Sequence, residues 1–146
     1  MNRLNRKIEY ALMALKNLSD KPVGELTNVN EVCNQTGAPF DATSRVMQIM
    51  VQEGILKSEH GARGGYALIK SLDDVSFEEL LHAILGPVEI VKCANGSVDC
   101  DLFHKCNVKS PLNLLNLKLR DFYKSLKVSD LLQTNRVEEP QSECIQ

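Results

Sequence analysis

The sequence has 146 residues, of which 43% are hydrophobic and 25% charged, so it can bury one core with a peripheral element but not two large domains. The net charge of −2 gives no basic footprint over the whole chain, although basic residues outnumber acidic ones in residues 1–70. No signal-peptide pattern or long apolar run is present, and the five cysteines do not suit a secreted disulfide framework. We therefore expect a cytoplasmic protein without a membrane span.

The first predicted element is an amphipathic helix over residues 4–18. Its charged residues are mostly basic, with Glu9 as the one acidic residue, a balance that suits contact with phosphate but is also typical of a solvated helix. The apolar residues that recur on one side at helical spacing are Leu4, Ile8, Ala11, Leu12, Leu15 and Leu18.

Two short helices are predicted next, over residues 29–35 and 40–52. Gly37 suits a left-handed helix end and Pro39 lies near the next helix start, so a tight turn joins the two helices. This order predicts a helix-turn-helix. The expected packing side of the second helix consists of Phe40, Val46, Met47, Ile49 and Met50. The expected outward side, either solvated or able to read DNA bases, consists of Asp41, Ser44, Arg45, Gln48 and Gln52.

A β-hairpin is predicted directly after the second helix. Residues 55–60 and 65–69 flank a turn that contains Arg63 between glycines. A helix-turn-helix followed by such a hairpin is a winged helix, in which the second helix enters the major groove and the wing arginine reaches the backbone or the minor groove. The wing therefore favours DNA contact over a merely solvated helix face.

A further helix is predicted from Ser76 to about Leu85. Ser76 and Glu79 have the spacing of a capping box, and Gly86-Pro87 ends the helix. We place the boundary of the DNA-binding domain here, with residues 1–86 forming the winged-helix unit.

Residues 87–109 form a loop that holds Cys93, Cys100 and Cys106. Thiolates this close together in a reducing compartment bind a soft metal or an iron-sulfur cluster more readily than they persist as disulfides. The loop has few apolar residues, so bound metal is expected to supply its order. A zinc site that includes His104 and an oxidative thiol switch are the open alternatives.

The last predicted helix begins with Ser110 as its N-cap and Pro111 at the first helical position, within a dimerisation region of residues 110–132. Leu114 and Leu117 widen its apolar stripe beyond what one small domain buries, which favours a homodimer. Residues 133–146 are polar and predicted to be a disordered tail. The expected dimer seam, at alternating three- and four-residue steps, consists of Leu112, Leu115, Leu119, Phe122 and Leu126.

Over residues 1–132 this order of elements resembles the Rrf-type winged-helix iron-sulfur transcriptional regulators, the family of IscR, NsrR and RirA. The most specific motifs are the wing Arg63-Gly64-Gly65-Tyr66 and the run of three cysteines. The resemblance implies a mainly α fold with a small β-wing, and a homodimeric regulator, expected to be a repressor, that binds double-stranded operator DNA. It also implies that a 2Fe-2S or 4Fe-4S cluster controls operator affinity by sensing redox state, nitric oxide or iron status.

The same resemblance implies roles for individual residues. Lys109 stands where IscR-like members have a histidine, and Glu9 matches an acidic residue that NsrR-like members contribute from the partner subunit, so Glu9 is the expected fourth ligand and His104 the runner-up. Arg63 matches the wing arginine.

No catalytic motif is present, so neither enzymatic activity nor a small-molecule substrate is expected. The alternative is a zinc-stabilised or thiol-switch winged-helix regulator that responds to another ligand. The residues expected to contact DNA from the second helix are Asp41, Ser44, Arg45 and Gln48.

Overall fold

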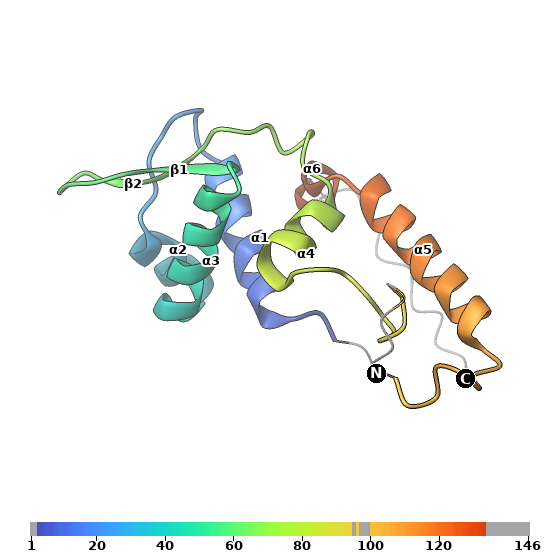
Figure 1. Ribbon diagram of the computed structural model, residues 1–146. Coiled ribbons are helices and arrows are strands. Elements are labelled where there is room, and N and C mark those ends of the chain that lie inside the picture. The colour runs from blue at the N-terminus through green and yellow to red at the C-terminus, as the bar shows by residue number, and fades with distance from the viewer. Residues whose placement is uncertain (1–2, 95, 97–99, 134–146) are drawn as a thin grey trace, which may run out of the picture.

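Helix α1 lies at the centre of the N-terminal part of the molecule and packs against α2, α3, α4 and β2 (Figure 1). The computed structural model describes residues 3–94, 96 and 100–133. Its elements are α1 (Arg6–Ser19), α2 (Val29–Thr36), α3 (Phe40–Gln52), β1 (Leu56–Glu59), β2 (Gly65–Leu68), α4 (Phe77–Leu85), α5 (Lys109–Ser125) and α6 (Val128–Leu132). The predicted fold class, mainly α with a small β-wing, is confirmed.

The helix-turn-helix forms where the sequence predicts it. Gly37 ends α2 in the left-handed conformation, with φ at 74°, and its N–H donates to the carbonyl of Cys33. Helix α3 then begins at Phe40 as expected. One assignment was wrong: Phe40 is 49% exposed rather than packed, because it is the first residue of α3 and lies ahead of the buried stretch, which begins with the fully buried Thr43. The buried residues of α3 are Thr43, Val46, Met47 and Met50.

The wing is an antiparallel pair in which Leu56 faces Leu68 and Glu59 faces Gly65. Gly65 is required at this place, because a Cβ on it would lie 2.8 Å from the carbonyl oxygen of Thr27. The close approach allows Thr27 and Tyr66 to exchange two backbone hydrogen bonds of 2.9 and 2.8 Å. The wing is therefore fixed to the segment that enters α2.

Helix α4 begins with the predicted capping box. The Ser76 side chain accepts from the Glu79 N–H at 3.1 Å, and the Ser76 N–H donates to the Glu79 carboxylate at 2.7 Å. The pKa of Glu79 is lowered mainly by the backbone hydrogen bond from Ser76. The ammonium of Lys70, 3.6 Å away, lowers this pKa further.

We expect Ser76→Ala to lower the free energy of unfolding by about 1 kcal/mol, the usual contribution of an N-cap. Because the folded-state pKa of Glu79 is lowered, the stabilisation from its carboxylate is complete above the ordinary pKa of a glutamic acid and is lost as the pH falls through the lowered value. Urea unfolding of the wild type, Ser76→Ala and Glu79→Gln at neutral and acidic pH measures both effects. A Glu79→Gln variant whose loss of stability is as large in acid as at neutral pH would contradict this account.

The C-terminal helices differ from the prediction in two ways. Helix α5 begins at Lys109, and its N-cap is Val108 without a side-chain hydrogen bond, so Ser110 is not the cap. Pro111 still lies in the first turn, where its missing N–H costs nothing. The predicted region 110–132 also contains a break at Leu126, after which the short helix α6 forms.

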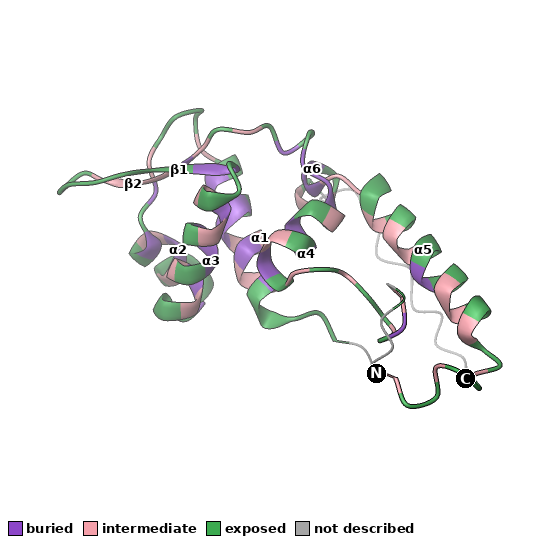
Figure 2. Ribbon diagram, viewed as in Figure 1, coloured by how far each residue is buried: buried purple, intermediate pink, exposed green. Residues whose placement is uncertain are grey.

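Helix α6 returns the chain to the core of the winged-helix unit. Phe77 N–H donates to the Leu126 carbonyl at 2.8 Å, Val128 N–H donates to the Val75 carbonyl at 2.9 Å, and Val128 is fully buried. Figure 2 shows the buried residues concentrated in α1, α3, α4 and α6, with α5 mostly exposed. No helix in the described ranges is long and apolar enough to cross a membrane. The predicted tail falls, from residue 134 onward, outside the described residues.

Candidate nucleic-acid interface and cysteine loop

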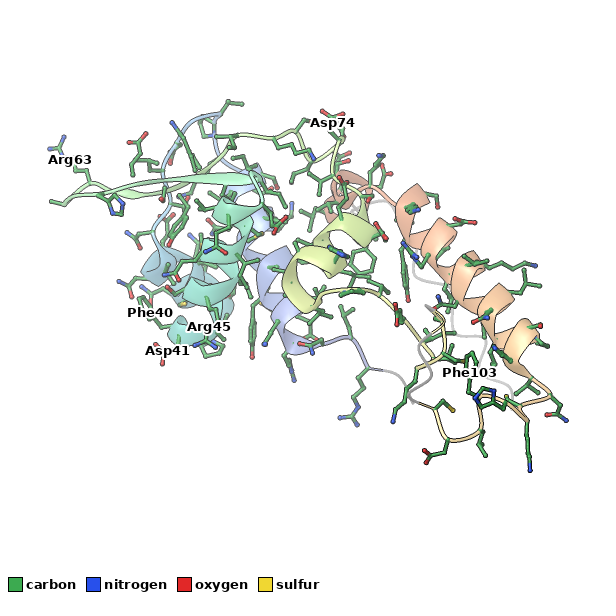
Figure 3. All side chains as sticks on the ribbon, viewed as in Figure 1. Phe40, Asp41, Arg45, Arg63, Asp74 and Phe103 are labelled. Atoms are coloured by element: carbon green, nitrogen blue, oxygen red, sulfur yellow. The ribbon has the colours of Figure 1, made fainter. Side chains whose placement is uncertain are left out.

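Helix α3 presents a continuous polar face to solvent. Asp41, Arg45 and Gln48 are exposed and Ser44 is half-buried, so the structure brings the four predicted residues together on one side of the helix. Figure 3 shows Asp41 and Arg45 projecting outward from the start of α3, with Phe40 beside them.

The wing carries Arg63 at its tip, well away from the body of the molecule (Figure 3). Arg63 is exposed, and neither it nor Arg45 forms an ion pair with any of the residues that the structure describes. By contrast, Lys57 at the base of the wing is paired with Glu59 at 3.1 Å. The two arginines therefore keep their full charge available for an external anion.

A groove separates α3 from the wing, and residues of three elements line it. Phe40 and Gln48 come from α3, Asn28 and Asn30 from the start of α2, and His60 from the hairpin turn. Gly64 and Gly65 also line the groove, and a Cβ on Gly64 would meet the Glu59 carbonyl at 2.2 Å. Its polar lining can donate hydrogen bonds to a phosphate or sugar.

The three cysteines lie in the loop between α4 and α5 as free thiols. Cys93 is 9% exposed, and Cys100 and Cys106 are half-buried. In the part of the chain that the structure describes, no three His, Cys, Asp or Glu side chains gather into a metal-binding group. The chemistry of the three donors fits an iron-sulfur cluster or zinc, but the single chain does not hold them in a ligand geometry.

His104 and Glu9 are both occupied by local contacts. His104 is exposed and packs edge-to-face on Phe103, with ring centroids 5.3 Å apart, while Lys109 places its ammonium 3.3 Å from the centroid of the Phe103 ring. Glu9 forms an ion pair with Arg6 at 2.8 Å and its side chain is 31% exposed. Glu9 therefore remains accessible from outside the chain, as a ligand to a partner's cluster has to be.

Helix α5 has one side against α4 and an apolar side in solvent. Tyr123 packs edge-to-face on Phe77, and Arg120 lies 3.4 Å from the Glu78 carboxylate. Of the predicted seam, Leu115 and Phe122 are 46% and 55% exposed, and Leu112, Leu119 and Leu126 are half-buried. Leu114 and Leu117 are also exposed.

Asn116 is the one buried residue of α5, and it was not among the residues predicted from the sequence. Its side-chain carbonyl accepts a hydrogen bond from the Ile90 N–H at 3.0 Å and so joins α5 to the start of the cysteine loop. The available signal was a polar residue in a Leu-rich helix at helical spacing from Arg120 and Tyr123, which together make the side that packs on the chain itself.

Comparison with known proteins places this arrangement in context. Residues 4–134 match the family model described as "Rrf2: Iron-dependent Transcriptional regulator". The chain is 30% identical over 106 residues to an HTH-type transcriptional regulator, rrf2-like, of Rhodobacter capsulatus, and the match covers 69% of this chain and 71% of that protein.

Solved structures show the same fold. CymR, the global cysteine regulator of B. subtilis, superposes with a TM-score of 0.70 at 18% identity, covering 90% of this chain and 97% of that one. The T. potens IscR structure gives a TM-score of 0.61 at 18% identity, covering 90% and 86%. At such identities the likeness concerns the fold alone.

Proposed function

Because this chain belongs to the Rrf2 family of transcriptional regulators, and is therefore a DNA-binding winged-helix regulator rather than an enzyme, we propose that it is a cytoplasmic homodimer that represses transcription by binding a palindromic operator. We propose further that an iron-sulfur cluster, held by Cys93, Cys100 and Cys106, controls its operator affinity. The observation that carries the proposal is the placement of the three free thiols between the DNA-reading unit and the exposed helix α5.

The DNA contacts follow from the two unpaired arginines and the polar face of α3. Arg45, Gln48 and Asp41 are exposed on the helix that enters the major groove of DNA in a winged helix. An arginine can donate two hydrogen bonds to a guanine, and a glutamine can pair with an adenine. Arg63 extends from the wing tip to the adjacent backbone or minor groove. Asp41 and Ser44 complete the proposed reading surface.

The cysteine thiolates supply soft ligands, and Glu9 of the partner subunit is the proposed fourth. A bound cluster would supply a centre that reacts with oxygen or nitric oxide and is lost when iron is scarce. Glu9 is a hard and weak ligand beside thiolates, so its bond is the one that breaks most easily. Because Glu9 is held by Arg6 in the single chain, its release from that ion pair accompanies ligation. His104 is the second choice.

Dimerisation through α5 gives a mutational prediction. We expect Leu115→Glu combined with Phe122→Glu to convert the dimer to a monomer, because both side chains are about half exposed and a dimer would bury them. A monomer contacts only one half-site, so operator affinity should fall by more than tenfold. Sedimentation equilibrium measures the oligomeric state.

The matched control for the dimer is Lys124→Glu, which makes the net charge more negative by the same amount as the two glutamates introduced at Leu115 and Phe122. Lys124 is exposed on the same helix but lies on the side opposite Leu115 and Phe122. This variant should remain dimeric. A Leu115→Glu, Phe122→Glu protein that sediments as a dimer would remove α5 as the interface.

We propose that the cluster changes operator affinity through the geometry of the dimer. Ordering the loop of residues 87–109 against the partner's α1 sets the distance and tilt between the two copies of α3, which must match half-sites about one DNA turn apart. A change in that geometry worth 1–3 kcal/mol shifts operator affinity by roughly 5- to 150-fold. The test is operator affinity, measured without oxygen for cluster-loaded and cluster-free protein on a duplex that the protein itself selects from a random library.

A second candidate function is a regulator without a cluster, and the lack of an assembled ligand group among the described residues favours its thiol-switch form. A zinc-stabilised or thiol-switch regulator would use the same fold and the same cysteines while responding to another ligand. Colour separates the two: protein prepared without oxygen absorbs visible light when it holds an iron-sulfur cluster and is colourless when it holds zinc or free thiols.

A further inference from the structure

Asn116 occupies an unusual place in α5. It is 4% exposed in the middle of a helix in which Leu114, Leu115 and Leu117 face solvent, so the helix buries a carboxamide where an apolar side chain would pack more favourably. A buried polar group of this kind is costly unless it is paired, and it commonly fixes the register of the elements that it joins. The hydrogen-bond partner of Asn116 shows which elements it joins.

The partner of Asn116 is the backbone at the start of the cysteine loop. The Asn116 side-chain oxygen accepts from the Ile90 N–H at 3.0 Å, across 26 positions of sequence. Ile90 follows the end of α4 by five residues, and α4 is itself held to α5 by the pair of Arg120 and Glu78 at 3.4 Å. Helix α5 therefore contacts both α4 and the start of the loop that follows α4.

The first cysteine follows this attachment directly. Beyond Ile90 the chain forms a turn in which the Ala94 N–H donates to the Val91 carbonyl at 3.2 Å, and Cys93, 9% exposed, lies inside that turn. A displacement of Ile90 relative to α5 must therefore move Cys93. The Asn116–Ile90 hydrogen bond thus connects the stretch from Ile90 to Cys93 with α5.

We infer that Asn116 is a positioning residue that transmits the state of the cysteine loop to α5, through its hydrogen bond to the Ile90 N–H. The inference rests on the proposed function, since it assigns the route by which a change at the cysteines reaches the dimer helix. Asn116 does not bind the cluster. Its role is to keep α5 and the turn around Cys93 moving as one body.

The chain offers a matched control one turn earlier. Asn113 lies on the same side of α5 and its side-chain oxygen is buried without a hydrogen-bond partner among the described residues. Asn113→Ala removes the same chemical group as Asn116→Ala but breaks no hydrogen bond of that oxygen. Asn116→Asp retains an acceptor oxygen at the correct place and serves as the conservative variant.

Two readouts test the inference on the full-length protein. The first is hydrogen exchange of the Ile90 amide in cluster-free protein, which we expect to be about fivefold faster in Asn116→Ala than in the wild type and restored in Asn116→Asp. The second is the ratio of operator affinities between cluster-loaded and cluster-free protein. We expect Asn116→Ala to bring this ratio close to 1 while the iron content stays at the wild-type level, and Asn113→Ala to change neither readout.

The two readouts distinguish failure of the Asn116 inference from failure of the proposed function. A wild-type ratio well away from 1 that Asn116→Ala leaves unchanged would overturn the role of Asn116 and leave the proposed function standing. An equal loss in Asn113→Ala would also overturn it, because the effect would then be one of packing. A wild-type ratio of 1 would instead remove cluster control, and the inference with it. If Asn116→Ala fails to fold, Asn116→Leu decides, because leucine fills the buried site and removes the acceptor oxygen, and a wild-type ratio in that variant would overturn the inference.

Discussion

Replacing Cys93, Cys100 and Cys106 with serine is expected to abolish binding of iron and sulfide and to fix operator affinity at a single value. Serine has almost the size of cysteine but presents a hard, protonated oxygen that does not replace a thiolate toward iron. Because serine fills nearly the same volume, and Cys100 and Cys106 are only half-buried, the loop should keep its packing while it loses its ligands. We expect the wild-type difference between cluster-loaded and cluster-free protein, roughly 5- to 150-fold, to vanish in this variant.

Cys33 provides the control for the cysteine experiment. It is a free, half-buried thiol on α2 that packs against the core, far in sequence from the loop. Cys33→Ser should retain iron and sulfide and should keep the wild-type change in operator affinity. A triple-serine protein that still binds iron and sulfide would show that the ligands lie elsewhere.

The proposed fourth ligand, Glu9, is tested by the same measurements of iron and sulfide. Glu9→Ala is expected to bind iron and sulfide when prepared without oxygen but to lose them faster in air, because the three thiolates remain and only the weak ligand is gone. His104→Ala should behave like the wild type. The reverse outcome, with rapid loss from His104→Ala and normal loss from Glu9→Ala, would exchange the two assignments.

Arg45→Ala is expected to cause the largest loss of operator binding among single changes on α3. Arg45 is exposed and free of ion pairs among the described residues, so its full charge and its fork of donors can be directed at a base. A bidentate contact to guanine contributes about 1–3 kcal/mol of discrimination. Fluorescence anisotropy with the selected duplex and with single-base variants measures both the affinity and the position that Arg45 reads.

Two further variants show whether the effect is specific. Arg63→Ala should weaken binding to all duplexes alike and lower the slope of log affinity against log salt by about 1, as expected for a phosphate contact. Lys124→Ala removes an exposed charge from α5, away from the reading surface, and should change little. Equal losses from Arg45→Ala and Lys124→Ala would mean that α3 does not read the operator.

The sequence predicted those parts of the fold that depend on neighbouring residues. Gly37 ends α2 because glycine adopts a positive φ without strain, and the Ser76 and Glu79 pair starts α4 through contacts three residues apart. The wing was predictable because two short strands flank a glycine-rich turn. The Leu-rich helix was also recognisable, although its start was placed two residues late.

The parts that escaped prediction depend on distant contacts. Helix α6 has only five residues, and Val128 is buried because the segment around Val75 lies beside it, which no local pattern indicates. Asn116 is buried because Ile90 meets it, and Phe40 is exposed because it lies at the start of α3, ahead of the first buried residue, Thr43. The predicted ligand set of the three cysteines and Glu9 stays a prediction, since it involves a second chain and a bound group.

The central claim is that the three thiols hold an iron-sulfur cluster, and the most direct test is the content of iron and acid-labile sulfide per chain. Full-length protein purified without oxygen should be coloured and should contain both elements in a fixed ratio to the chain. Colourless protein with zinc, or with neither iron nor sulfide, would contradict the account.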